Sequence, residues 1–139
     1  MALRTTLSMM ALAVTSVLLP ACNKPIPPPD PKGKDIVAGA VVAAVTTAEK
    51  EPGIRTYKVI HVDDYPEPVG HNYHLIAYDP KAKTFEEARE LRWRGVMTVV
   101  LPHFEVRAVD FLPRDHRVLG VEPLSDQERS AYEKARTGQ

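Results

Sequence analysis

The chain has 139 residues, and its 18 lysines and arginines balance 18 aspartates and glutamates, so the net charge at pH 7 is zero with neutral histidines. Without a basic stripe interleaved with aromatic residues, the sequence excludes a nucleic-acid-binding protein of the electrostatic kind. The single cysteine, Cys22, lies between an apolar run and a cluster of prolines. Its position needs a specific explanation.

Residues 1–21 have the pattern of a secretory signal. Arg4 gives the start a positive charge, Leu7 to Leu19 is almost wholly apolar, and no acidic residue occurs before Asp30. The apolar run is shorter than the roughly 20 residues that a membrane-spanning helix needs. We therefore expect this segment to direct export and then to be removed.

The apolar run closes with Leu19-Pro20-Ala21-Cys22. This segment resembles the lipobox of bacterial lipoproteins, in which a leucine and a small residue precede an obligatory cysteine. The resemblance covers residues 1–22 and implies that Cys22 carries a diacylglyceryl group and that the bond between Ala21 and Cys22 is cut. Pro20 departs from the pattern, which has a small or hydroxyl residue there. The alternative is a free or buried cysteine.

The same resemblance implies a lipid-anchored protein of the cell envelope. One acyl chain binds a membrane only marginally, so stable anchoring needs a second signal. In such lipoproteins an aspartate directly after the cysteine favours the inner membrane, and this chain has Asn23 there. We therefore expect the protein to be anchored in the outer membrane rather than the inner one, with its domain facing either the periplasm or the exterior.

Residues 22–35 combine the cysteine with a proline-rich segment. Five prolines, with Gly33 and three lysines, leave this segment no apolar core. The composition is typical of a semi-rigid, polyproline-like tether. The alternative is a proline ligand for a partner's aromatic groove. Residues 36–139 then form a single domain.

We predict a helix for residues 36–48, which are apolar nearly all round and begin after Asp35, a possible N-cap. The competing interpretation is a strand, because Ile36, the valines and the threonines are β-branched and Gly39 weakens a helix. Residues 54–62 and 72–78 are predicted strands, separated by a turn cluster.

The second half of the chain begins with a capping-box pattern, Thr84 to Glu87, which predicts a helix to residue 94. Residues 96–101 form a continuously apolar run that favours a central strand. Residues 104–111 and 116–122 are expected to pair as a hairpin, and Ser125 is the expected N-cap of a short C-terminal helix.

This order of elements predicts an α+β domain, with a small, mainly antiparallel sheet of about five strands and two or three helices on one face. The residues expected in the core of the sheet are Ile60, Val62, Leu75, Ala77, Val99, Leu101, Val106 and Leu119, matched by Phe85 and Leu91 of the helix.

The histidines raise the possibility of a metal-dependent enzyme or metal carrier; all five lie in the domain, as His61, His71, His74, His103 and His116. A zinc site needs several such donors at about 2.0–2.2 Å from the metal. His71 and His74, three residues apart in a strand, point to opposite faces, whereas His61 and Asp63 share a face. No HExxH motif is present. We therefore expect no cofactor and no metal.

Catalytic side chains are scarce. Beyond the signal there are two serines, Ser125 and Ser130, and the first is better explained as an N-cap, so a serine hydrolase is disfavoured. The nearest candidates for paired carboxylates in glycoside cleavage are Asp63, Asp64 and Glu67. A turn rich in Asp and Pro is usually just a turn.

Two features suggest binding. Asp63, Asp64 and Tyr65 open the segment DDYPEPVGHNYH, either a partner-binding loop or a proline-stiffened connection. Trp93 lies off the apolar stripe of its helix, so it either covers a neighbouring strand or contacts a partner. The sequence thus predicts an envelope lipoprotein with a small non-catalytic binding or assembly module, its partners being the membrane and an envelope protein. A purely structural envelope component is a further alternative.

Overall fold

The structure is a computed structural model that describes residues 36–47 and 49–138. The predicted signal, Cys22 and the tether lie outside the described residues, and what was inferred about them stays a prediction. Within the described part, no helix is long and apolar enough to cross a membrane.

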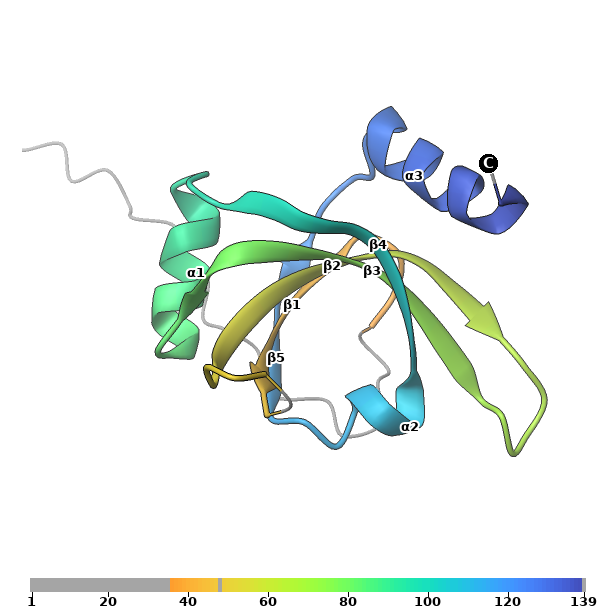
Figure 1. The fold of residues 1–139 in the computed structure, drawn as a ribbon, viewed down its shortest axis with the longest axis horizontal. Coiled ribbons are helices and arrows are strands. Elements are labelled where there is room, and N and C mark those ends of the chain that lie inside the picture. Colours follow the sequence, from red (N-terminus) through yellow and green to blue (C-terminus); the bar gives the residue numbers. More distant parts are fainter. Residues whose placement is uncertain (1–35, 48, 139) are drawn as a thin grey trace, which may run out of the picture.

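Five strands form one antiparallel sheet in the order β4-β3-β2-β1-β5, shown in Figure 1. In chain order the elements are β1 (Ala40–Thr46), β2 (Gly53–Asp64), β3 (His71–Ala82), α1 (Phe85–Trp93), β4 (Thr98–Arg107), α2 (Ala108–Phe111), β5 (His116–Val121) and α3 (Asp126–Thr137). This confirms the predicted class, a small α+β domain with a five-stranded antiparallel sheet.

The helix predicted for residues 36–48 is wrong, because β1 is a strand between β2 and β5. Val42 and Ala44 belong to one apolar cluster and Ala43 to another, so both faces of β1 are buried. A strand covered on both faces is apolar all round, as a buried helix is. The β-branched residues were the correct signal, and Gly39 takes a left-handed φ of +90° in the turn before β1.

The central strand predicted for residues 96–101 and the hairpin of residues 104–111 with 116–122 are also wrong. A single strand, β4, runs through Pro102 along one edge of the sheet, and the chain then turns into α2. β5 pairs with β1 at the other edge. The predicted number of strands is nevertheless right. The predicted strands 96–101 and 104–111 are one strand, β4, and the unpredicted strand β1 restores the total of five. Proline is tolerated in an edge strand, whose outward N–H groups have no partner.

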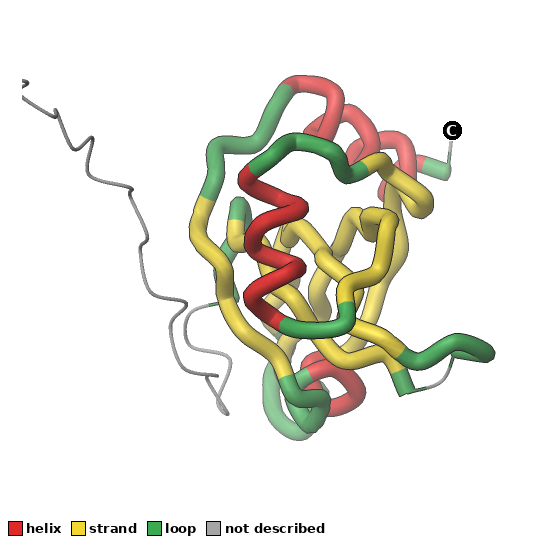
Figure 2. Tube along the Cα trace, turned by 90° about the vertical axis from the view of Figure 1, so that its left-hand side faces the viewer, coloured by secondary structure: helices red, strands yellow, loops and turns green. Residues whose placement is uncertain are grey.

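The helices cover both faces of the sheet rather than one, as the views in Figures 1 and 2 show. On one face, α2 contributes Ala108 and Phe111 to a cluster with Tyr57 and Leu75; we call this the α2 face. On the other face, α1 packs through Ala88, and α3 packs through its partly buried Tyr132. The expectation that the helices share one face is therefore wrong for α2.

The predicted core is correct near the middle of the sheet and wrong at its edge. Ile60, Leu75 and Ala77 are buried, whereas Val99 is 51% exposed and Leu101 is 49% exposed. Three further predicted residues and the two helix residues pack partly buried against the clusters: Val62, Val106, Leu119, Phe85 and Leu91.

The helix starts predicted at Thr84 and Ser125 are confirmed. Thr84 Oγ1 accepts a hydrogen bond from the Glu87 backbone N–H at 3.1 Å. At α3 the capping box is complete: Ser125 Oγ accepts from the Glu128 N–H at 3.2 Å, and Glu128 Oε2 accepts from the Ser125 N–H at 2.8 Å. Such caps satisfy N–H groups that have no partner within the helix.

Candidate functional site

Of the three loop residues predicted to bind a partner, Asp63 and Tyr65 are joined by a hydrogen bond from the Tyr65 hydroxyl to Asp63 Oδ2 at 3.4 Å, whereas Asp64 has a different partner. Asp64 is exposed at the end of β2 and pairs with His71 Nδ1 at 2.5 Å. Tyr65, 46% exposed, begins the turn, with its backbone N–H bonded to Gly70 O at 2.9 Å. Asp63 turns instead toward the face that carries α3, where it meets His74. The exposed pair, Asp64 and Tyr65, stays a candidate contact for a partner.

A bulge in β2 controls which side chains Asp63 meets. Val59 pairs with Leu75, but His61 pairs with the preceding residue His74, so Ile60 is the extra residue. Strict alternation would place Ile60 and His61 on opposite faces. Because of the bulge, Ile60 packs in the α3 cluster and the His61 ring also stacks on Tyr132 of α3.

Three histidines and Asp63 form a continuous series of polar contacts, which we call the histidine chain. His103 Nε2 lies 2.9 Å from His74 Nδ1, and His74 Nε2 lies 2.8 Å from Asp63 Oδ2. The other oxygen, Asp63 Oδ1, lies 3.1 Å from His61 Nε2. An ionised carboxylate only accepts, so His74 Nε2 must donate to Asp63, and a neutral His74 then accepts from His103 through Nδ1.

The electrostatics of the histidine chain follow from these contacts. The hydrogen bond with His74 lowers the pKa of Asp63 and outweighs the raising effect of burial. Burial lowers the pKa of His103, and the neighbouring His74 lowers it further. Both effects favour an ionised Asp63 and a neutral His103 near pH 7.

The histidine chain does not resemble a metal centre. Both ring nitrogens of His74 are engaged by side chains, and no group of three or more His, Cys, Asp or Glu residues in the described part is arranged to hold a metal ion. His71 contacts Asp64 instead, and the buried His116 bonds the Arg114 carbonyl through Nδ1 at 2.8 Å. The five histidines therefore fall into three separate places.

The histidine chain and a buried ion pair together fasten α3 to the sheet. The Tyr132 ring stacks on His61 at 4.3 Å between centroids and meets His74 edge-on at 5.0 Å. Lys58 Nζ reaches from β2 to Glu128 Oε2 at 2.8 Å. No residue of α3 is fully buried, so its attachment depends on contacts of this kind at partly exposed positions.

Trp93 ends α1 and is 80% exposed, so the interpretation that it covers a neighbouring strand is wrong. Its side chain borders a shallow cavity of about 310 Å³ that also touches Leu119 and Gly120 of β5. An exposed indole remains a candidate hot spot for a partner.

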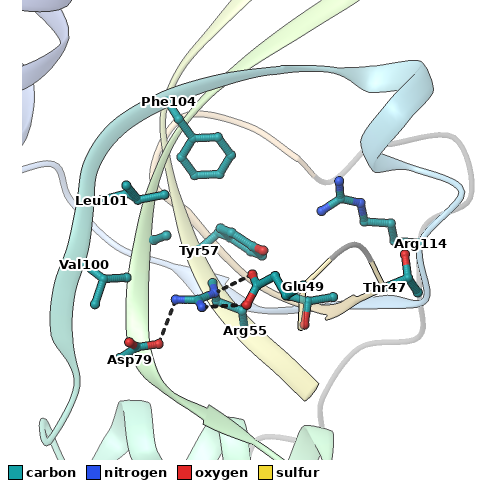
Figure 3. A pocket seen from close by; sticks show the side chains of 11 residues that line it. Thr47, Glu49, Arg55, Tyr57, Asp79, Val100, Leu101, Phe104 and Arg114 are labelled. Atoms are coloured by element: carbon teal, nitrogen blue, oxygen red, sulfur yellow. Dashed lines mark hydrogen bonds and ion pairs between the residues drawn. The ribbon is translucent and has the colours of Figure 1, made fainter. Parts of the chain in front are cut away.

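A larger cavity, about 400 Å³, opens on the α2 face (Figure 3). We call it the α2-face cavity. Apolar side chains from three strands form one part of its lining, namely Tyr57, Ala77, Val100, Leu101 and Phe104. The polar part is formed by Thr46, Thr47, Glu49, Arg55, Asp79 and Arg114. Its lining combines apolar, acidic and basic side chains.

Arg55 organises the polar part of this cavity. Its guanidinium holds Glu49 through two nitrogens, at 3.2 Å and 2.9 Å, and Asp79 through the third, at 2.7 Å. Lys81 Nζ also lies 2.8 Å from Glu49. The hydrogen bonds from Arg55 and then Lys81 lower the pKa of Glu49 to about 2. Glu49 is therefore ionised at neutral pH.

The edge strand β4 borders the same cavity with apolar side chains. Val99, Val100 and Leu101 are 51%, 39% and 49% exposed. Leu101 pairs with Ala77 and Val99 pairs with Tyr78, so Val100 is the extra residue of a bulge. The bulge lets Val100 and Leu101 both line the cavity.

Sequence reasoning missed this site. Arg55, Tyr57 and Arg114 are widely spaced in the chain and form no motif, and Leu101 was assigned to the core. The proline within an otherwise apolar strand, Pro102, was the one available sign of an edge. A scan against protein-family models, a search of curated proteins and a search of solved structures each found no match.

Proposed function

We propose that this chain is an envelope lipoprotein, anchored through lipid on Cys22 in the outer membrane, whose domain is a non-catalytic binding module. The order of signal, lipobox cysteine, proline-rich tether and single domain supports the anchor. The module's partner is an envelope protein that stands within reach of the tether.

The observation that carries the binding role is the exposed apolar half of β4. Three consecutive apolar side chains, Val99 to Leu101, are each at least 39% exposed on a strand at the edge of the sheet. Edge strands of soluble proteins are normally shielded against pairing, and contiguous exposed apolar surface marks interaction sites. This half of β4 is therefore a surface that a partner covers.

The geometry favours an extended segment of the partner, added beside β4. Val99 pairs with Tyr78, which packs on the α3 side, whereas Leu101 pairs with Ala77 on the α2 face. A strand laid against β4 would bond its backbone and cover side chains on both faces. Pro102 and the bulge at Val100 limit the regular pairing to a short stretch.

The described side chains favour binding over catalysis. Ser125 caps α3, and the two cavities described above are lined by no histidine. The histidine chain is engaged in holding α3. Among residues 36–47 and 49–138, no specific contact favours the alternative of a metal-dependent enzyme or carrier.

Photocrosslinking tests the proposed surface. A photoreactive amino acid at Val100 should give a discrete adduct with an envelope protein in intact cells. The same group at Val109, an equally apolar residue of α2 that is 57% exposed, is the matched control and should give none. Equal adducts from both positions, or none from Val100 in a folded and lipidated protein, would refute the proposal.

A further inference from the structure

We propose that the α2-face cavity binds a monoanionic amphiphile, a carboxylate on an apolar chain, with the carboxylate on Arg114 and the chain along Leu101 and Phe104. This inference concerns a small-molecule site and goes beyond the protein partner proposed above. It does not depend on the lipid anchor or on the β4 partner.

The charged contacts in the cavity are shared unevenly between its two arginines. Arg55 forms ion pairs with Glu49 and Asp79, and Glu49 also forms an ion pair with Lys81, which lies outside the lining. Arg114 forms an ion pair with no carboxylate among residues 36–47 and 49–138; its guanidinium lies over the Phe111 ring, 5.7 Å from the centroid. The lining holds two carboxylates and two arginines, but both carboxylates bond Arg55, so Arg114 is the cation of the lining without a carboxylate partner among the described residues.

Arg114 is held in a position to receive a ligand. Its backbone N–H bonds Phe111 O at 3.1 Å, and its carbonyl accepts from His116 Nδ1 at 2.8 Å, so the residue is fixed at both ends. Its guanidinium also interacts with the Tyr57 hydroxyl, but packing over an aromatic ring uses none of its five N–H donors, so donors remain for a ligand. The arginine fork matches the two oxygens of a carboxylate. The geometry therefore suits a planar anion.

A second donor lies in the same cavity. Burial raises the pKa of Tyr57, against the opposing charges of Arg114 and Arg55, so its hydroxyl is protonated at neutral pH. A protonated phenol can donate to an anion. In Figure 3 the Tyr57 ring lies between Arg114 on one side and Leu101 on the other. An anion at Arg114 would thus have Tyr57 beside it and apolar side chains beyond.

The rest of the lining decides what the anion is attached to. Val100, Leu101 and Phe104 offer apolar contacts at the side away from Arg114 (Figure 3). Glu49 and Asp79 repel any anion in the cavity, and they repel a dianion such as a phosphate monoester more strongly than a single carboxylate. A volume of about 400 Å³ lies in the range of small-molecule sites. The chemistry points to a single carboxylate on an aliphatic body.

The test uses the mature-length chain from residue 22, with Cys22→Ser so that no lipid or detergent is present. The probes are octanoate, 1-octanol and octylamine, which share one apolar chain and differ in charge. Calorimetry and amide NMR shifts should show saturable one-to-one binding of octanoate, with shifts at Leu101 and Phe104. Octanol should bind about tenfold more weakly, because it lacks the charge-assisted contact, and octylamine should not bind.

Matched variants separate charge from packing. Arg114→Gln should weaken octanoate about tenfold and leave octanol unchanged. Arg129→Gln makes the same charge change on exposed α3 and should have no effect. Leu101→Ser, at a half-exposed position that tolerates change, should weaken octanoate and octanol alike. If Arg114→Gln does not fold, Leu101→Ser and the three probes still decide the question.

Each remaining outcome overturns the proposal. Equal affinity for the three probes would show adsorption to apolar surface, and shifts confined to α3 would place the ligand elsewhere. The absence of octanoate binding would exclude the site. None of these results affects crosslinking at Val100, so failure here is distinguishable from failure of the proposed partner surface.

Discussion

Replacing Glu128 by glutamine should destabilise the domain by about 2 kcal/mol, because it removes one charge of a buried ion pair. The Lys58 side chain is 4% exposed and the Glu128 side chain 16% exposed, with Nζ and Oε2 separated by 2.8 Å. Lys58 Nζ also donates to Pro123 O at 2.9 Å. These contacts join β2 to the start of α3.

The expected loss of stability depends on which interactions remain to Lys58 and to residue 128 after the substitution. Removing one partner from a fully buried pair costs about 3–5 kcal/mol, because the other charge is left without compensation. Lys58 would keep Pro123 O, and Glu122 Oε2 lies 3.8 Å away. The pair is also partly open to solvent, so we expect about 2 kcal/mol. Glutamine retains an oxygen for the Ser125 N–H, so the helix cap should survive.

The assay is urea unfolding of a double-mutant cycle with Lys58→Met, Glu128→Gln and the double variant. The double variant should lose about 1–2 kcal/mol less than the sum of the single losses, since no buried charge is left unpaired. Arg129→Gln with Asp126→Asn, an exposed pair at 3.8 Å on the same helix, is the control and should show no measurable coupling. Strictly additive losses would refute the reasoning.

The same pair gives a pH dependence with a defined sign. Burial alone would raise the pKa of Glu128, but the hydrogen bonds from Lys58 and from the Ser125 N–H outweigh it, so the folded pKa lies below the ordinary 4.5. A carboxyl with a lowered pKa stabilises the folded state above its unfolded pKa, and this contribution is lost as the pH falls through the folded pKa. The stability difference between the native chain and Glu128→Gln should therefore shrink from pH 6 to pH 3; a constant difference would contradict this.

Three further predictions concern other parts of the chain. Cys22→Ala should leave an uncleaved precursor without radiolabelled palmitate, and a labelled, trimmed variant would contradict the lipobox. The purified mature chain, dialysed and assayed by elemental analysis, should contain far less than one equivalent of zinc or copper; a stoichiometric ion would favour the metal alternative. Deleting residues 25–31 should leave thermal stability and membrane fractionation unchanged but weaken the Val100 crosslink, and a polar spacer of equal length should restore it. A spacer that fails would show that the prolines themselves are recognised.

The parts of the fold that sequence predicts well are those with local signals. The caps at Thr84 and Ser125 depend on side chains three residues apart, and the structure has both. The alternating strands β2 and β3 were placed for the same reason. The sheet order was not predictable, because β1 becomes a central strand only through pairing with β5, far along the chain. Apolar content alone does not distinguish a buried interior strand from an exposed edge strand. Both β1 and the first half of β4 are apolar, but β1 is buried and Val99 and Leu101 of β4 are half-exposed.

The candidate site was still less predictable, because bulges and long-range pairing create it. His61 and Asp63 were expected to share a face, and they do, but contact with His74 requires the bulge at Ile60. No composition rule places a bulge in β2. The α2-face cavity likewise joins residues separated by most of the domain, from Thr46 to Arg114.

The two proposed binding surfaces share side chains, and this has a thermodynamic consequence. Val100 and Leu101 line the α2-face cavity and also stand exposed on the edge strand that a partner would cover. A ligand in the cavity that fixes these side chains changes the free energy of binding beside β4, and by linkage the partner changes the affinity for the ligand by the same factor. Because the bulge at Val100 directs both side chains toward the cavity, the coupling should be local to β4 and should not extend to Trp93 beside β5. Either site can therefore bind alone, but where both are occupied the shared side chains Val100 and Leu101 are expected to link the two affinities.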